Sequence, residues 1–280
     1  MQKDFPVHQL PLVDFLASDQ SPAFGPHVPS HRINFYAIVW FLKDGGKHYI
    51  DFEEHAVRKN SVYLIGKNQI HSIPATRLPH ARTIVFSTTF FDHIEEPYLR
   101  QLFFPFHSRG TDIPADMLLP MKHLFELIML ESNTTADRSL LLKYTTILLT
   151  YLLRFSKSDF SALATEDNRM LRLFQLLEAN YQEHRPASFY ARQIGLTPKR
   201  VNEILRQKMG TTINGLLNRL LLLEAKRELS HQQYAIKEIA YKLGFSDQSY
   251  FARFFKKHTG MAPERFRDQG GSGFGIRAPQ

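Results

Sequence analysis

The sequence predicts an α+β protein of several domains: a small β-barrel with following helices, then an all-α domain that contains two helix-turn-helix motifs. Three observations predict this. The first part of the 280-residue chain holds short aromatic and β-branched runs between turn residues, the last hundred residues have helical apolar spacing, and basic residues gather in that last part. We expect domains at 1–160 and 169–269, joined by a linker at 161–168 and followed by a flexible tail at 270–280.

The N-terminal strands are marked by composition. The run INFYAIVWFL, residues 33–42, is aromatic and β-branched and predicts one largely buried strand. Residues 43–46, KDGG, are a turn signal, so the alternating residues 47–52 are expected to return beside that strand as a hairpin. Further strands are predicted at 61–65, 69–73 and 81–87. Many short strands with turn punctuation favour a small barrel or a double-sheet jelly roll.

Two helices are predicted after the strands, at 118–131 and 138–155, from their apolar spacing. The second carries a broad leucine stripe, which either covers the barrel or forms a two-fold dimer seam. We favour the dimer seam, whose predicted residues are Leu141, Leu142, Leu148, Leu149 and Leu152.

A helix-turn-helix pattern occurs twice in the last hundred residues. Each copy has a small residue, Ala191 or Ala240, four positions before a glycine, Gly195 or Gly244, which allows the turn its positive φ. Thr197 with Pro198 begins the next helix of the first copy, and Ser246 or Asp247 begins that of the second. The second turn is one residue longer, because its apolar triplet starts seven residues after the glycine rather than six.

Between the two copies, residues 213–230 predict one long helix, about 27 Å at 1.5 Å per residue. Its leucines at 216, 217 and 220–223 lie nearly all round it, so we expect a buried strut. A rigid strut of this length would hold two recognition helices about one DNA turn, roughly 34 Å, apart. The two helices would then enter successive major grooves on one face of the duplex.

The exposed face of each recognition helix follows from its apolar triplet, which is Val201, Ile204 and Leu205 in the first and Phe251, Phe254 and Phe255 in the second. Arg and Lys pair with guanine, and Asn and Gln with adenine. The predicted base contacts are Lys199, Asn202, Glu203, Gln248, Ser249 and Arg253. Glu203 has the alternative of pairing with Arg200 or Lys199. The predicted phosphate contacts are Arg200, Arg206, Lys256 and Lys257.

The charge distribution agrees with contact to phosphate. Residues 169–268 carry 18 Lys and Arg against 9 Asp and Glu, whereas residues 1–168 carry 16 against 18. A basic domain beside a near-neutral one is the electrostatic pattern of nucleic-acid binding.

Other classes of protein lack support in the sequence. The chain has no cysteine, which excludes disulfides and thiol chemistry, and we expect neither signal peptide nor membrane span but a cytoplasmic protein. We expect no cofactor and no enzymatic activity. The remote alternative is a metal-dependent barrel enzyme, since histidines stand at positions 27, 31, 48, 71 and 80, but their spacing does not indicate a metal site.

The second motif and the residues after it carry a family resemblance. The string from Ile236 to Arg267, with Ile239-Ala240, Gly244-Phe245, Ser249-Tyr250-Phe251, Phe254-Phe255-Lys256-Lys257, Gly260, Pro263 and Phe266, resembles the signature of AraC/XylS-type bacterial transcription regulators. With the first motif, the resemblance covers roughly 100 residues. The resemblance implies a bacterial, nucleoid-associated DNA-binding regulator that usually activates transcription with RNA polymerase, and it favours a homodimer.

The N-terminal half is similar to the cupin-like sensing domain of many such regulators, although Ile65 stands where a proline often precedes Gly66. An aromatic-lined barrel suits an apolar or aromatic effector, with Arg32 as a partner for a carboxylate. The predicted effector residues are His31, Arg32, Phe35, Tyr36, Trp40, Tyr49 and His71. The alternative is that these aromatic side chains only fill the barrel.

The function predicted from these patterns is a ligand-responsive, sequence-specific transcription activator. Two alternatives remain open: a regulator without a small-molecule effector, controlled by abundance or by a protein partner, and a repressor.

Overall fold

The computed structural model describes residues 7–8, 13–19, 28–73, 80–105, 110–156 and 168–269. The backbone contacts of the described residues divide them into two compact units, one within Pro6–Ser161 and the other within Ala162–Gln280. The predicted tail 270–280 lies outside the described residues, as does the predicted linker 161–168 except for Asn168.

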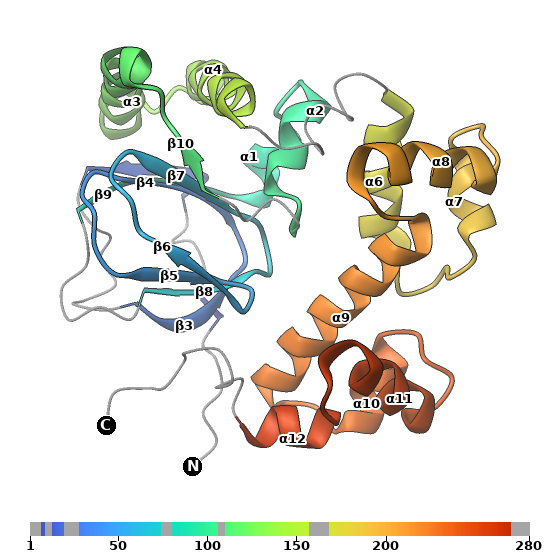
Figure 1. Ribbon diagram of the computed structural model, residues 1–280. Coiled ribbons are helices and arrows are strands. Elements are labelled where there is room, and N and C mark those ends of the chain that lie inside the picture. Colours follow the sequence, from blue (N-terminus) through green and yellow to red (C-terminus); the bar gives the residue numbers. More distant parts are fainter. Residues whose placement is uncertain are drawn as a thin grey trace. The chain divides into compact units, whose positions relative to one another are not determined.

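Two five-stranded sheets build the first unit (Figure 1). The first sheet, in order β1-β3-β8-β5-β6, consists of Val7–His8, Val28–Ile33, Ile70–Ile73, Lys47–Ile50 and Glu53–Ala56. The second sheet, in order β10-β7-β4-β9-β2, consists of Thr111–Asp112, Ser61–Ile65, Tyr36–Phe41, Ala81–Phe86 and Phe15–Ser18. All described pairings are antiparallel except that of β1 with β3. The predicted double-sheet architecture is confirmed.

Two details of the predicted strands are wrong. The run 33–42 is not one strand, because the chain crosses at Asn34–Phe35 from β3 in the first sheet to β4 in the second. Residues 47–50 do not form a hairpin with β4, because β5 lies in the first sheet and pairs with β6 and β8. Gly45 and Gly46, at φ 136° and 79°, occupy the bend after which the chain enters that sheet.

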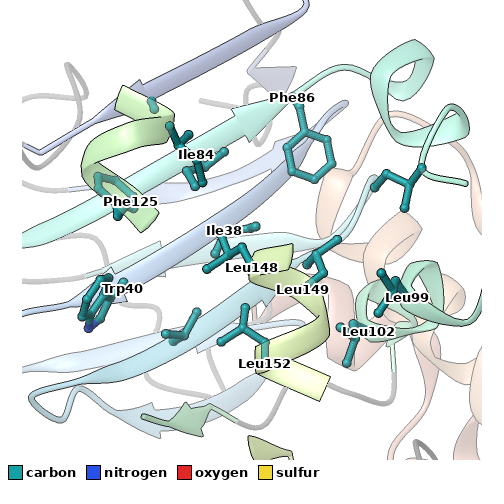
Figure 2. Packing of buried hydrophobic residues seen from close by; sticks show 14 of the residues in the cluster. Ile38, Trp40, Ile84, Phe86, Leu99, Leu102, Phe125, Leu148, Leu149 and Leu152 are labelled. Carbon is teal, nitrogen blue, oxygen red and sulfur yellow. The ribbon is translucent and has the colours of Figure 1, made fainter. Parts of the chain in front are cut away.

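Helices cover the outer face of the second sheet. They are α1 (Thr88–Asp92), α2 (Pro97–Arg100), α3 (Leu118–Asn133) and α4 (Arg138–Phe155), with 3₁₀ turns at Gln101–Phe103 and Ala115–Met117. Alternate residues of β4, such as Ile38 and Trp40, pack with Phe125 of α3 and Leu148 of α4 (Figure 2). The other β4 side chains, such as Val39, pack between the two sheets. The unit therefore has two apolar layers, one on each face of β4.

The second unit is helical throughout its described part (Figure 1). Its helices are α6 (Asn168–Asn180), α7 (Ala187–Gln193), α8 (Pro198–Met209), α9 (Ile213–His231), α10 (Ile236–Lys242), α11 (Gln248–Thr259) and α12 (Pro263–Asp268). The long helix α9 contacts α6, α7 and α8 as well as α10, α11 and α12. At 19 residues it is about 28 Å long, which confirms the predicted central helix.

The buried surface of α9 is only partly apolar. Leu216, Leu217, Leu220 and Leu221 are buried, but further along the helix Arg227 is also buried and is only 2% exposed. Arg227 donates a hydrogen bond and forms an ion pair with Glu224, and Glu228 forms an ion pair of 3.1 Å with Lys242 of α10. The prediction of an apolar strut is therefore wrong for the second half of α9, where buried charges are paired instead.

No helix in the described part of the chain is both long enough and apolar enough to cross a bilayer.

Candidate nucleic-acid interface

The first motif comprises α7, a turn at Gly195, and α8. Gly195 has φ 68°, the left-handed conformation that favours glycine. The Thr197 hydroxyl then accepts the backbone N–H of Arg200 at 3.2 Å and so caps α8, which begins with Pro198. These local features are those predicted from the sequence.

The second motif comprises α10, a turn at Gly244, and α11. Gly244 has φ 73°, and the cap is Asp247, whose carboxylate accepts the backbone N–H of Tyr250 at 2.7 Å. That hydrogen bond holds the pKa of Asp247 below its usual value, with smaller contributions that include the charge of Arg253. The cap lies three residues after Gly244 but two after Gly195, which confirms that the second turn is one residue longer.

Both recognition helices, α8 and α11, turn their apolar residues inward. Val201, Leu205, Phe251 and Phe255 are fully buried. The opposite faces are exposed and carry most of the predicted DNA contacts, which are Lys199, Arg200, Glu203, Arg206, Gln248, Ser249, Arg253, Lys256 and Lys257. Helices α8 and α11 therefore each present one exposed polar face that bears several cationic side chains.

Asn202 differs from the other predicted base contacts. Its side chain is half-buried, and its amide oxygen accepts the backbone N–H of Ile213 at 2.9 Å. A bidentate pair with adenine needs both the oxygen and the nitrogen of the amide. In this structure the oxygen fixes the start of α9, which gives Asn202 a structural contact, and the base contact predicted for Asn202 stays a prediction.

Glu203 is paired with a neighbouring cation in this structure, and its predicted base contact stays a prediction. Its carboxylate forms an exposed ion pair of 3.3 Å with Arg200, one helical turn earlier. Such a pair between exposed side chains is weak. It nevertheless directs the Glu203 carboxylate toward Arg200 in this structure.

Tyr250 is an exposed residue that the sequence reasoning passed over. It lies in the first turn of α11, 52% exposed, and its ring contacts Phe245 edge-on with centroids 5.6 Å apart. The N-terminal turn of a recognition helix is the part that reaches base edges. In the sequence, the position of Tyr250 three residues after the helix cap Asp247 indicates that it lies in this turn.

The seven predicted effector residues do not form one site. His31, Phe35 and His71 point between the sheets, as the inward positions of their neighbours Ile33 and Ile73 show. Tyr36 and Trp40 instead face the covering helices, with Trp40 packed edge-on against Phe125 (Figure 2). Arg32 and Tyr49 share the outer face of the first sheet, because each is paired with β8 at residues 70 and 72, whose parity is opposite to that of His71.

The space between the sheets holds a cluster of histidines. The ring centroids of His31 and His71 are 4.2 Å apart, and that of His48 lies 5.6 Å from His71 and 5.2 Å from Tyr63 of the second sheet. His48 is fully buried, and neither of its ring nitrogens has a hydrogen-bond partner among the residues that the structure describes. Burial, reinforced by His55 and His31, lowers the pKa of His48 to about 3. No group of side chains in the described residues has an arrangement that would hold a metal ion.

The predicted dimer residues are corrected as well. Leu141, Leu148, Leu149 and Leu152 are buried in the layer between α4 and the second sheet, and Leu142 packs against the same layer (Figure 2). The leucine stripe of α4 thus faces the second sheet, which α4 covers. Three exposed leucines lie on α3, where Leu119, Leu127 and Leu130 are 60%, 45% and 62% exposed.

The geometry thus defines a class: a protein with two helix-turn-helix motifs on one long helix, each presenting an exposed recognition helix. A family model described as "Helix-turn-helix domain" matches residues 190–269. The chain is 24% identical over 270 residues to the "HTH-type transcriptional activator RhaS" of Salmonella arizonae, a match that covers 91% of this chain and 95% of the relative.

Solved structures of lower likeness include ToxT from Vibrio cholerae, at 14% identity and a TM-score of 0.46, covering 91% of this chain and 97% of that one. An AraC-type regulator from Chromobacterium violaceum matches at 23% identity and a TM-score of 0.35, covering 38% of this chain and 96% of that one. The sequence matches to the motif and to RhaS carry the assignment. The chain is thus a DNA-binding transcription regulator, similar in its motif region to the helix-turn-helix family model and along 91% of its length to an HTH-type transcriptional activator.

Proposed function

We propose that this regulator activates transcription by reading two successive major grooves, with α8 in one and α11 in the next. The observation that carries the proposal is the attachment of both recognition helices to α9, about 28 Å long, with their basic faces exposed. Major grooves on one face of B-DNA repeat every 34–36 Å or so. The activator name of the relative RhaS supports the sign of regulation, and RNA polymerase is the partner that activation requires.

The base-reading residues under this proposal are Lys199 and Glu203 on α8 and Gln248, Ser249 and Arg253 on α11. Their side chains are exposed on the faces opposite the buried residues. Tyr250 joins them as an exposed residue in the first turn of α11. Arg200, Arg206, Lys256 and Lys257 hold phosphates, because they extend the same faces with positive charge.

Selection of binding sites from random duplex DNA with the full chain tests this proposal. The expected result is a motif of two half-sites about one helical turn apart. Lys199→Ala should then weaken the sequence preference in one half-site only, and Arg253→Ala in the other. A single half-site, or one in which both variants act on the same positions, contradicts the proposal.

A second proposal concerns the space between the sheets: a small effector binds there, beside His48. A buried polar group without a hydrogen bond is costly, and His48 has two nitrogens without a hydrogen-bond partner among the described residues, beside the rings of His71 and Tyr63. A neutral imidazole offers one donor and one acceptor, which suits an apolar or aromatic molecule with one polar group. Arg32 cannot bind a carboxylate at this place, because it lies on the opposite face of the sheet.

Thermal unfolding of the full chain with phenol and with benzoate as probes tests the effector proposal. A ligand that binds only the folded state raises the midpoint of unfolding. The rise should disappear in His48→Phe, which keeps the ring and removes both nitrogens. A rise that persists in His48→Phe, or the absence of any rise, contradicts a site at His48.

We also propose that the protein forms a homodimer and acts in the bacterial cytoplasm. For the dimer, the exposed leucines of α3 replace the leucines of α4 as the proposed contact surface.

A further inference from the structure

The turn glycines of the two motifs have the same backbone conformation but different surroundings. Gly195 has φ 68° and Gly244 has φ 73°. A Cβ atom on Gly195 would meet no atom of the described residues within 4 Å, whereas one on Gly244 would clash with the backbone carbonyl oxygen of Gln182. Gln182 belongs to the loop between α6 and α7, which leads into the first motif. The turn of the second motif is therefore packed directly against that loop.

Arg185 of the same loop contacts the residues on either side of Gly244. Its Nη2 donates a hydrogen bond of 2.6 Å to the carbonyl oxygen of Leu243, and its guanidinium lies 4.5 Å from the ring centroid of Phe245. Arg185 is half-buried, and this burial lowers its pKa. A guanidinium both donates in a fixed geometry and stacks on an aromatic ring, which a lysine does less well.

The loop is fixed to the first motif at its other end. The Tyr190 hydroxyl of α7 donates to the carbonyl oxygen of His184 at 2.7 Å, and the ring of Phe189 stacks on His184 with centroids 3.9 Å apart. Phe245 in turn contacts the recognition helix α11 through Tyr250, Phe251 and Phe254, with centroids 5.1–5.6 Å apart. A continuous set of contacts thus joins α7 to α11 without passing through α9.

We propose that Arg185 is a positioning residue that fixes the angle between the two recognition helices and thereby the spacing of half-sites that the protein accepts. The inference rests on the proposed reading of two grooves. Helix α9 joins the two motifs along its own axis, and by itself it would not fix the rotation of one motif relative to the other about that axis. The contacts of Arg185 and the packing of Gln182 against Gly244 restrain this rotation. One added base pair turns the second half-site by about 34–36° and moves it by about 3.4 Å. Only recognition helices held at a fixed angle to each other would bind poorly to the longer site.

The experiment is selection from random duplex DNA with the full chain, followed by affinity measurement on selected sites with zero or one base pair inserted between the half-sites. The wild-type chain should recover one spacing and lose about tenfold or more in affinity on insertion. Arg185→Ala should recover the same two half-sites with several spacings and lose about threefold or less on insertion. Arg185→Lys, which keeps the charge and a donor, should fall between them.

A paired glycine comparison provides the second test, independent of whether Arg185→Ala folds. Gly195→Ala and Gly244→Ala carry the same left-handed strain, but only the second displaces the loop at Gln182. Gly244→Ala should broaden the spacing and Gly195→Ala should not.

Four results would overturn the proposal or its basis. They are an unchanged single spacing in a folded Arg185→Ala, a spacing broadened equally by both glycine variants, an unchanged spacing in Gly244→Ala, and a wild-type chain that recovers several spacings. A wild-type chain that enriches no pair of half-sites would contradict the proposed function itself. This result is distinct from the four above, which bear on the positioning role of Arg185.

Discussion

The amide oxygen of Asn202 in α8 accepts the backbone N–H of Ile213, the first residue of α9, at 2.9 Å. The recognition helix of the first motif is thereby tied to the beginning of the helix that joins the two motifs. The first N–H groups of a helix have no partner within the helix, so an outside acceptor stabilises its start. We therefore expect Asn202 to hold the geometry of the interface rather than to contact bases.

Replacement of Asn202 by alanine should lower the free energy of unfolding by about 1 kcal/mol, because the Ile213 N–H loses its acceptor. The sequence preference of the folded protein should stay the same at every base position. Urea unfolding and site selection measure the two effects. Asn202→Asp keeps an acceptor oxygen and should retain the stability. A lost preference for one base in Asn202→Ala would restore Asn202 as a base contact.

Arg253 and Lys256 are exposed on α11, and we expect them to act on different parts of the DNA. Arg253→Ala should cost about 1–3 kcal/mol on the selected site and little on random DNA. Lys256→Ala should weaken both alike and reduce the dependence of affinity on salt by about one unit of slope. Fluorescence titrations at several salt concentrations check this. An equal loss on both DNAs for Arg253→Ala would show that it contacts phosphate.

Leu148 and Leu130 lie on the two helices that cover the second sheet but differ in burial, at 3% and 62% exposed. Leu148→Glu places a charge in the layer between α4 and the sheet and should destabilise the N-terminal domain by about 4 kcal/mol. Leu130→Glu should change stability by no more than about 0.5 kcal/mol and should convert a dimer to a monomer if α3 is the contact surface. Sedimentation and urea unfolding measure both. A folded, stable Leu148→Glu would contradict the packing described here.

His48 predicts a pH dependence of stability. Its pKa is about 3 in the folded chain, against an ordinary value of 6.5, so the unfolded state takes up a proton between these values and the folded state does not. The free energy of unfolding should therefore fall as pH decreases below about 6.5. The neighbouring histidines 31, 55 and 71 and Tyr63 remain in His48→Phe, which should show a smaller fall between pH 7 and pH 5. The same fall in both proteins would contradict the assignment to His48.

The helical half of the chain was predicted closely, because its signals are local. Gly195 and Gly244 mark the turns, Thr197 and Asp247 cap the helices that follow, and the apolar triplets set which face is buried. The structural contact of Asn202 was not predicted, because a helical wheel shows only that Asn202 lies beside Val201, and its partner Ile213 is eleven residues away.

The N-terminal half was predicted less well, because its apolar residues are buried in two different layers. Residues 33–42 are apolar on both faces of β4, so no polar alternation distinguishes Trp40, which faces the helices, from Val39, which faces the other sheet. The leucine stripe of α4 likewise fits a sheet or a second copy of the chain equally well. Which layer receives each side chain depends on the order of the strands, which is not a local property of the sequence.

The central claim is that α8 and α11 enter successive major grooves on one face of the same duplex. Methylation interference at guanine N7, which lies in the major groove, tests it most directly, with the full chain bound to its selected site. The account predicts two groups of interfering positions whose centres are about 10 base pairs apart, one weakened by Lys199→Ala and the other by Arg253→Ala. A single group of positions, sensitive to both variants, would contradict the account.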